Sequence, residues 1–127
     1  MTVTIEEDDL VVRMQGWERL WALCGELRVP RKSIKAVTWH ETAILSGKDI
    51  GWRVGTGFPN VLIAGWFYNK LRGRSFLYLP RARYHLTTLE ARQVLSLKLM
   101  NYPRCNWVHL AYVDERFATR LRTWTNL

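Results

Sequence analysis

The sequence has little cysteine and proline, and it has no long apolar run. Of its 127 residues, 2 are cysteine and 4 are proline. Two thiols, Cys24 and Cys105, are too few for the disulfide framework of a small secreted domain. The longest apolar run, Val61–Tyr68, is far shorter than the ~18 residues that a membrane-spanning helix needs. The acid-rich start, Met1–Leu10, does not resemble a secretory signal, so we expect a cytoplasmic protein with free thiols, and the inner membrane face is an alternative location.

The composition excludes a chain that is disordered over most of its length. Hydrophobic residues make up 48% of the sequence and aromatic residues 13%, which is richer in bulky side chains than disordered proteins are. A chain of this length has room for one hydrophobic core. We therefore expect a single domain over residues 1–127.

Positive charge is concentrated in the second half of the chain. Residues 1–69 hold eight basic and eight acidic side chains, whereas residues 70–127 hold eleven basic and three acidic ones. The formal net charge of +8 therefore comes from the second half. An arginine-rich surface attracts phosphate backbones, acidic membrane headgroups or acidic proteins, and the alternative interpretation is a charge that serves solubility alone.

Alternation of apolar and polar residues predicts strands in the first third of the chain. An N-terminal hairpin is expected, with the acids of residues 6–9 in its turn. Its inward-facing residues are Val3, Ile5, Leu10, Val12 and Met14. From Gln15 to Gly25 the apolar period changes to that of a short helix, whose Trp17 and Trp21 are expected to cover a core. Two strands follow, over Leu27–Val29 and Ser33–Trp39.

The pattern of the remaining residues also predicts mainly strands. Residues 41–60 have four Gly, one Pro and no sustained period, which predicts the longest loop. Further strands are predicted over Val61–Tyr68, Arg74–Leu79, Gln93–Leu99 and Asn106–Val113. Asp114 is a suitable N-cap for a C-terminal helix with Phe117, Leu121 and Trp124 on one face. These elements predict a mainly β fold, an antiparallel β-barrel or roll of about seven strands whose open end the terminal helix caps.

Three segments spread over most of the chain carry a family resemblance. They are Gly25–Pro30 (GELRVP), Gly51–Pro59 (GWRVGTGFP) and Val113–Arg122, which begins VDERFA. Together they resemble the pleckstrin-homology (PH) superfold, and more closely small bacterial proteins that have a PH-like domain and no established activity. PH members that bind phosphoinositides use a basic first hairpin, whereas Glu6–Asp9 make the first hairpin acidic here. The resemblance therefore implies a PH-like fold rather than a ligand.

The motifs of nucleotide, metal and catalytic sites are missing. Gly55 and Gly57 lack the third glycine of the dinucleotide fingerprint, because position 60 is Asn. Cys105 and His109 would lie about 13 Å apart along a strand, which is too far for shared metal ligation. The sequence also has no Gly-x-Ser-x-Gly motif around a nucleophile. We therefore expect no cofactor, no metal ion and no enzymatic activity.

Two basic clusters are the sharpest candidates for a binding site. The first is Lys70, Arg72 and Arg74, and the second is Arg81 and Arg83, followed by Tyr84 and His85. Strand spacing would project the three cations of the first cluster to one side of a hairpin, where arginine forks can hold phosphate or carboxylate oxygens. The aromatic residues beside the second cluster equally suit single-stranded nucleic acid. A solvated turn or linker is the alternative interpretation of each cluster.

The remaining candidates are Trp52 and Arg53, in the Gly47–Asn60 part of the predicted loop. Tryptophan and arginine are enriched at the hot spots of protein interfaces. We therefore predict a non-enzymatic binding or scaffolding module that contacts a protein partner or a second copy of itself. The alternative function is peripheral recognition of anionic membrane lipid, or of another phosphate-bearing ligand, through the basic hairpin. Nucleic acid is the less favoured partner.

Overall fold

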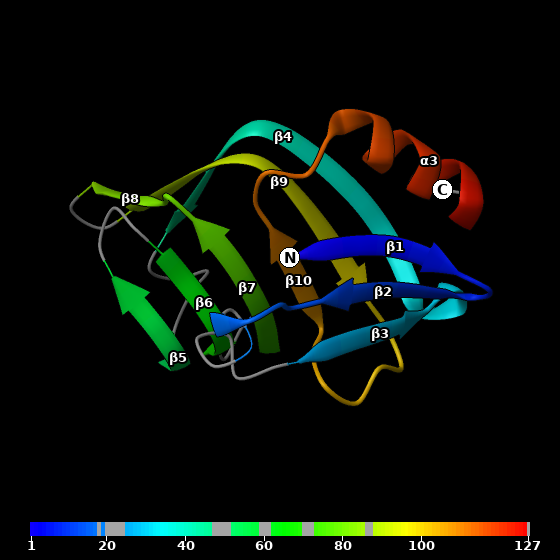
Figure 1. Ribbon diagram of the computed structural model, residues 1–127, viewed down its shortest axis with the longest axis horizontal. Coiled ribbons are helices and arrows are strands. Elements are labelled where there is room, and N and C mark those ends of the chain that lie inside the picture. Colours follow the sequence, from blue (N-terminus) through cyan, green and yellow to red (C-terminus); the bar gives the residue numbers. More distant parts are fainter. Residues whose placement is uncertain are drawn as a thin grey trace.

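The computed structural model is mainly β, with an α-helix near the C-terminus (Figure 1). It describes residues 1–17, 19, 25–46, 52–58, 62–69, 73–85 and 88–126, of which 45–46, 52–58, 62–63, 69, 84–85 and 88 are described by their backbone alone. The first elements are β1 (Thr2–Glu6), β2 (Asp9–Arg13), β3 (Glu26–Pro30), the 3-10 helix η1 (Arg31–Ser33), β4 (Ile34–Ser46) and β5 (Trp52–Phe58). They are followed by β6 (Leu62–Asn69), β7 (Gly73–Pro80), β8 (Arg83–His85), β9 (Thr88–Leu99), β10 (Trp107–Leu110) and α3 (Glu115–Thr125).

The strands form two separate sheets. The smaller sheet is antiparallel in the order β1-β2-β3, and its first pair is the predicted N-terminal hairpin, with Val3 opposite Val12. The larger sheet has the order β4-β9-β10-β7-β6-β5, and β8 pairs with the first part of β9. Strand β10 runs parallel to β7, whereas the other pairs of this sheet are antiparallel. The larger sheet is therefore mixed.

The predicted barrel is the main difference between expectation and structure. In the described part of the chain, β4 and β5 lie at opposite ends of the larger sheet's order and do not pair with each other. The sheet is therefore not closed into a barrel. Alternation within each strand predicts which residues are buried, but it does not predict whether the two outer strands meet, because closure depends on the tilt and register of all the strands together.

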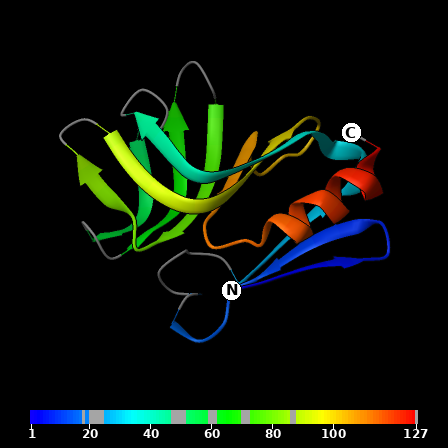
Figure 2. The ribbon, with the colours of Figure 1, turned by 90° about the horizontal axis from the view of Figure 1, so that it is seen from above.

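The main core fills the space between the two sheets and the helix (Figures 1 and 2). The smaller sheet contributes Leu10, Val12, Leu27 and Val29, all fully buried. The larger sheet contributes fully buried residues from four strands, which are Ala64, Phe76, Leu95, Leu97, Val108 and Leu110. Strand alternation confirms the predicted inward face of β9, because Leu95, Leu97 and Leu99 all lie in this core.

A second core lies on the opposite face of the larger sheet. It contains Phe67, Leu77, Leu79, Leu89 and Val94, together with four alanines. The middle strands of the larger sheet are therefore buried on both faces, which explains the almost continuous apolar run of β7. Figure 2 shows that β4 and β9 bend strongly along their length, so that the two cores lie toward different ends of the same strands.

The C-terminal helix begins where the sequence predicts. The side chain of Asp114 accepts a hydrogen bond from the backbone N–H of Arg116 at 2.9 Å, which confirms the N-cap. Leu121 is fully buried in the main core, and Phe117 and Trp124 pack against it. The Arg122 guanidinium donates to the carbonyl of Val37 at 3.2 Å, which connects α3 to β4. The helix thus covers the main core rather than the end of a barrel.

Two predictions for the first half of the chain were wrong. The predicted loop of residues 41–60 contains the second half of β4 and all of β5, because β4 continues to Ser46 in register with β9. Trp17 does not cover a core, since 73% of its surface is exposed. Most of the predicted helix of residues 15–25, including Trp21, lies outside the described residues. That helix stays a prediction.

The packing of α3 generates the first testable prediction. Leu121→Ala removes a fully buried side chain from the main core and should lower the free energy of unfolding by about 2–5 kcal/mol. Thr119→Ala, on the exposed side of the same helix, should change it by less than about 0.5 kcal/mol. Chemical denaturation of both variants measures the difference. Equal destabilisation would show that α3 does not contribute its leucine to the core.

Candidate functional site

Three arginines line a hollow at one end of the larger sheet. The hollow has a volume of about 630 Å³, within the range of ligand sites in proteins. The described residues that line it are Arg81, Arg83, Glu90, Arg92 and Tyr112. We call this hollow the arginine groove. In Figure 1 the strand β8 marks this end of the molecule, and the turn between β1 and β2 lies at the other end.

The pairing of β8 with β9 positions the charged side chains of the groove. Arg83 on β8 lies directly opposite Glu90 on β9. Arg92 is two residues farther along β9, so strand alternation places it on the same face as Glu90. The intervening Ala91 is buried in the second core, which confirms that the charged residues point outward. Arg81 enters the groove from the turn before β8.

The backbone at the groove has an unusual conformation at three non-glycine residues. Arg81, Gln93 and Tyr112 have φ values of 59°, 50° and 57°, in the left-handed region. Such conformations cost of order 1 kcal/mol or more each and are held by the surrounding structure. Here the backbone N–H groups of Tyr112 and Val113 donate to the carbonyls of Arg92 and Gln93, each at 3.0 Å. These two bonds hold the segment after β10 against β9 and bring Tyr112 to the groove.

The three arginines of the groove are exposed, and they outnumber its described acid. The ion pairs between described residues lie in the smaller sheet, and none of them involves Arg81, Arg83 or Arg92. Glu90 is the one acid among the five lining residues. Guanidinium groups form paired, charge-assisted hydrogen bonds with phosphate oxygens. The arrangement can therefore bind a multiply charged anion, with Tyr112 at its border.

The structure brings together only part of the predicted basic residues. Arg81 and Arg83 meet in the groove, where Arg92 joins them. Sequence reasoning missed Arg92, although its position follows once β8 is paired with β9, because Arg92 then lies two residues beyond the partner of Arg83. The side chains of Tyr84 and His85 lie outside the described residues.

The predicted basic hairpin does not contribute to the arginine groove. Arg74 lies near the start of β7, and Arg81 follows the end of this strand, so that about 23 Å of extended chain separates them. The Arg74 guanidinium donates to the carbonyl of Pro103 at 2.8 Å, and this hydrogen bond attaches Arg74 to the turn before β10. Lys70 and Arg72 lie outside the described residues. Their role in binding stays a prediction.

Trp52 and Arg53 are placed by their backbone alone. They begin β5, opposite Tyr68 and Phe67 of β6, rather than lying in a long loop. Their side chains are not among the described ones, so their predicted role in a protein interface stays a prediction.

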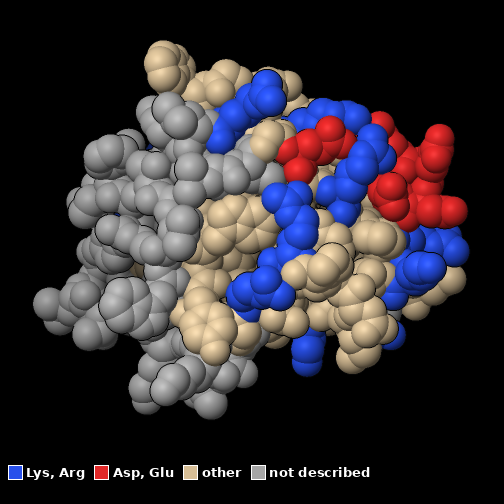
Figure 3. Space-filling view, turned by 90° about the horizontal axis from the view of Figure 1, so that it is seen from below, with Lys and Arg blue, Asp and Glu red and all other residues tan. Residues whose placement is uncertain are grey.

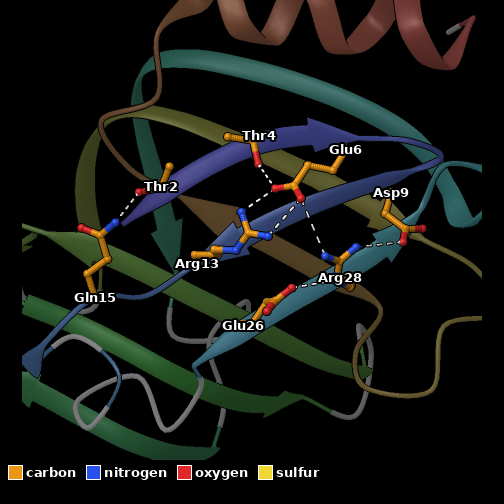
Figure 4. A network of polar contacts seen from close by, with 8 residues as sticks. All are labelled: Thr2, Thr4, Glu6, Asp9, Arg13, Gln15, Glu26 and Arg28. Carbon is orange, nitrogen blue, oxygen red and sulfur yellow. Dashed lines mark hydrogen bonds and ion pairs between the residues drawn. The ribbon is translucent and has the colours of Figure 1, made fainter.

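The smaller sheet shows how arginines are neutralised elsewhere in this protein (Figure 4). Arg13 donates to both carboxylate oxygens of Glu6 across the hairpin, and Thr4 donates to the same carboxylate at 2.8 Å. Arg28 forms ion pairs with Glu6, Asp9 and Glu26. Seen from below, basic side chains form a band beside a group of acidic ones, so this face of the molecule has mixed charge (Figure 3).

This network changes the pKa values of its members. The hydrogen bond from Arg13, followed by that from Thr4, lowers the pKa of Glu6 from its ordinary 4.5 to about 2. The hydrogen bond to Glu6 raises the pKa of Arg13, and the hydrogen bond to Glu26 raises the pKa of Arg28. The network stabilises the charged hairpin and leaves its arginines unsuited to binding an external anion.

A buried polar pair interrupts the outer face of β9 and β10. Ser96 and His109 lie opposite each other, with the serine hydroxyl 2.8 Å from His109 Nδ1. The His109 ring stacks on Trp107 with centroids 5.8 Å apart, and Lys98 Nζ lies 5.9 Å from the centroid of the Trp107 ring. Both members of the pair are at least nine-tenths buried. The hydrogen bond satisfies two polar groups inside the sheet, which is the usual condition of buried polar side chains.

The described residues show neither a metal-binding cluster nor a membrane-spanning helix. Across the described ranges, no three His, Cys, Asp or Glu side chains come together in a way that could hold a metal ion. None of the helices described has the length and apolar character that crossing a bilayer requires. No family model, curated protein or solved structure matches this chain.

The network of Glu6 generates a pH prediction. A lowered folded-state pKa contributes stability above the unfolded value of 4.5, and this contribution disappears as pH falls through about 2. Glu6→Gln cannot ionise, so it should melt at a lower temperature than the natural protein above about pH 5. The difference should shrink as pH falls toward 2, which thermal unfolding over this range measures.

A second variant tests the cause of this effect. In an Arg13→Gln background, Glu6→Gln should show a much smaller pH-dependent difference, because the largest cause of the lowered pKa is gone. An undiminished difference in that background would contradict the assignment to Arg13.

Proposed function

We propose that this protein is a binding domain for a phosphate-bearing ligand, which it holds in the arginine groove. The observation that carries this proposal is the convergence of Arg81, Arg83 and Arg92 on one hollow without an ion pair among the described residues. Arg13 and Arg28 of the smaller sheet, by contrast, are paired with acids. Unpaired guanidinium groups on a concave surface favour binding of an external anion.

Glu90 restricts the ligands that the groove favours. Among the described lining residues, one carboxylate stands against three guanidinium groups, which is an excess of positive charge. That charge favours a dianion or a polyanion over a single carboxylate.

The proposal does not depend on the PH resemblance. A mainly β fold with a C-terminal helix is what the structure has in common with that expectation, and the PH-like assignment remains a prediction. The arginine groove lies at β8 and β9, whereas the first hairpin, β1 and β2, carries a neutralised acidic network. The ligand would therefore bind at a different place from the hairpin that phosphoinositide-binding PH members use.

The other predicted function, contact with a protein partner or a second copy, also remains a hypothesis. It was based on Trp52 and Arg53 in a long loop, and this segment belongs to a strand instead. Absence of enzymatic activity is likewise a prediction. The described residues favour anion binding over protein contact because the groove is concave, basic and positioned by paired strands.

A titration with inorganic pyrophosphate tests the proposed function. The triple variant Arg81→Ala, Arg83→Ala and Arg92→Ala should bind at least about tenfold more weakly, because it loses the charge-assisted hydrogen bonds. The control variant Lys35→Ala, Arg116→Ala and Arg120→Ala removes the same charge from exposed positions elsewhere and should retain binding. Calorimetry or nuclear magnetic resonance at low and physiological salt measures both affinities.

The outcomes of this titration are distinct. Loss in the groove variant alone supports the proposal. Equal loss in both triple variants would mean that net charge, rather than the groove, attracts the anion. No binding of pyrophosphate by the natural protein would also overturn the proposal.

A further inference from the structure

A large exposed aliphatic side chain lies next to the arginine groove. Ile44 on β4 has 66% of its surface exposed. Its cross-strand partner on β9 is Glu90, whose partner on β8 is Arg83. The three residues therefore form one row across three neighbouring strands. With strands about 4.8 Å apart, the row places Ile44 about 10 Å from Arg83.

The exposure of Ile44 follows from the strand itself. Its neighbour Ala43 is buried in the second core, opposite the buried Ala91. Alternation then turns Ile44 away from that core, to the face that carries Glu90 and Arg92. Thr42, which lies opposite Arg92, is exposed on this face as well. The outer face here thus combines cations with an aliphatic side chain that the fold does not cover.

Tyr112 adds an amphipathic side chain to the same region. It lines the groove and has 42% of its surface exposed. Tyrosine has an apolar ring and a polar hydroxyl, and it is enriched where a protein meets the boundary between membrane and water. An arginine side chain likewise combines an apolar stem with a charged head. The region therefore contains the three kinds of side chain that suit an interfacial position.

We infer that the arginine groove docks on the surface of an anionic lipid bilayer, with Ile44 entering the interface beside the phosphates that the arginines bind. This inference rests on the proposed function and specifies the source of the phosphate. Basic residues near an anionic leaflet attract it, and apolar side chains add burial below the headgroups. The acidic turn between β1 and β2 lies at the other end of the molecule and does not oppose this orientation (Figure 1).

A bilayer fits the region better than a nucleic acid does. Both supply phosphates, but only the bilayer supplies an apolar layer directly beneath them. In nucleic-acid grooves, bases stack on aromatic rings. Tyr112 offers one such ring, but the exposed aliphatic side chain of Ile44 offers no stacking surface. Ile44 is therefore the residue that distinguishes these partners.

Vesicle co-sedimentation of the full chain tests the inference. The natural protein should bind vesicles of phosphatidylcholine mixed with phosphatidylglycerol, and not vesicles of phosphatidylcholine alone. The groove triple variant should bind the anionic vesicles about a hundredfold more weakly, since each basic residue contributes about a fivefold gain near such a surface. The control triple variant should lose much less, and raised salt should weaken binding.

Two substitutions of Ile44 test whether its apolar surface contributes to vesicle binding. Ile44→Ser should weaken binding to anionic vesicles about tenfold, whereas Ile44→Leu should preserve it, because only the first removes the apolar surface. Neither change should alter the affinity for pyrophosphate, which measures the groove without a bilayer. Because Ile44 is exposed, both variants should unfold at nearly the natural temperature.

The results separate the inference from the function on which it rests. Groove-dependent pyrophosphate binding together with Ile44-dependent vesicle binding supports both proposals. Pyrophosphate binding without vesicle binding, or vesicle binding that Ile44→Ser leaves unchanged, would overturn the membrane inference alone. Tighter binding of a single-stranded oligonucleotide than of anionic vesicles would also overturn it. Failure to bind pyrophosphate would overturn the proposed function.

Discussion

Strand β9 is the element on which the larger sheet depends. It pairs with β4 along nearly its whole length, with β8 at its beginning and with β10 toward its end. Leu95 and Leu97 enter the main core, whereas Leu89 and Val94 enter the second one. Leu89 and Leu95 would share one face of a regular strand, yet they lie in different cores, so the alternation of β9 is interrupted between them. That interruption coincides with the left-handed conformation of Gln93, and Val113 donates a backbone hydrogen bond to its carbonyl.

The arginine groove lies next to the same part of β9. The first part of β9 carries Glu90 and Arg92 outward, while Ala91 between them is buried. The segment that follows β10 crosses this part of β9 and brings Tyr112 beside Arg92. The arginines of the two sheets differ in their surroundings. In the smaller sheet Arg13 and Arg28 are paired with acids, whereas the three arginines of the groove face solvent.

The sequence predicted well those features that depend on neighbouring residues. The first hairpin, the hairpin of β6 and β7, and the Asp114 cap were all confirmed. Predictions for residues whose structure depends on segments distant in sequence were more often wrong. In the low-periodicity segment, residues 41–46 and 52–58 are strand because β9 and β6 supply partners, which outweigh its glycines and lack of pattern. Trp17 is exposed although its spacing suggested a buried helical face.

The candidate site was predictable in part. Arg81 and Arg83 were identified because they are close together in sequence, whereas Arg92 was missed because only the pairing of β8 with β9 makes it their neighbour. By itself, the sequence determined the alternation of faces within each strand, the start of the last helix and the excess of positive charge in the second half. Only the tertiary structure decided that β10 lies between β7 and β9, that the sheet stays open and that three arginines meet. The physical reason is the distance along the chain over which the responsible interactions act. Side-chain direction follows from a period of two residues, whereas strand order depends on which distant segments bury the most surface together after the entropy of closing the intervening loops.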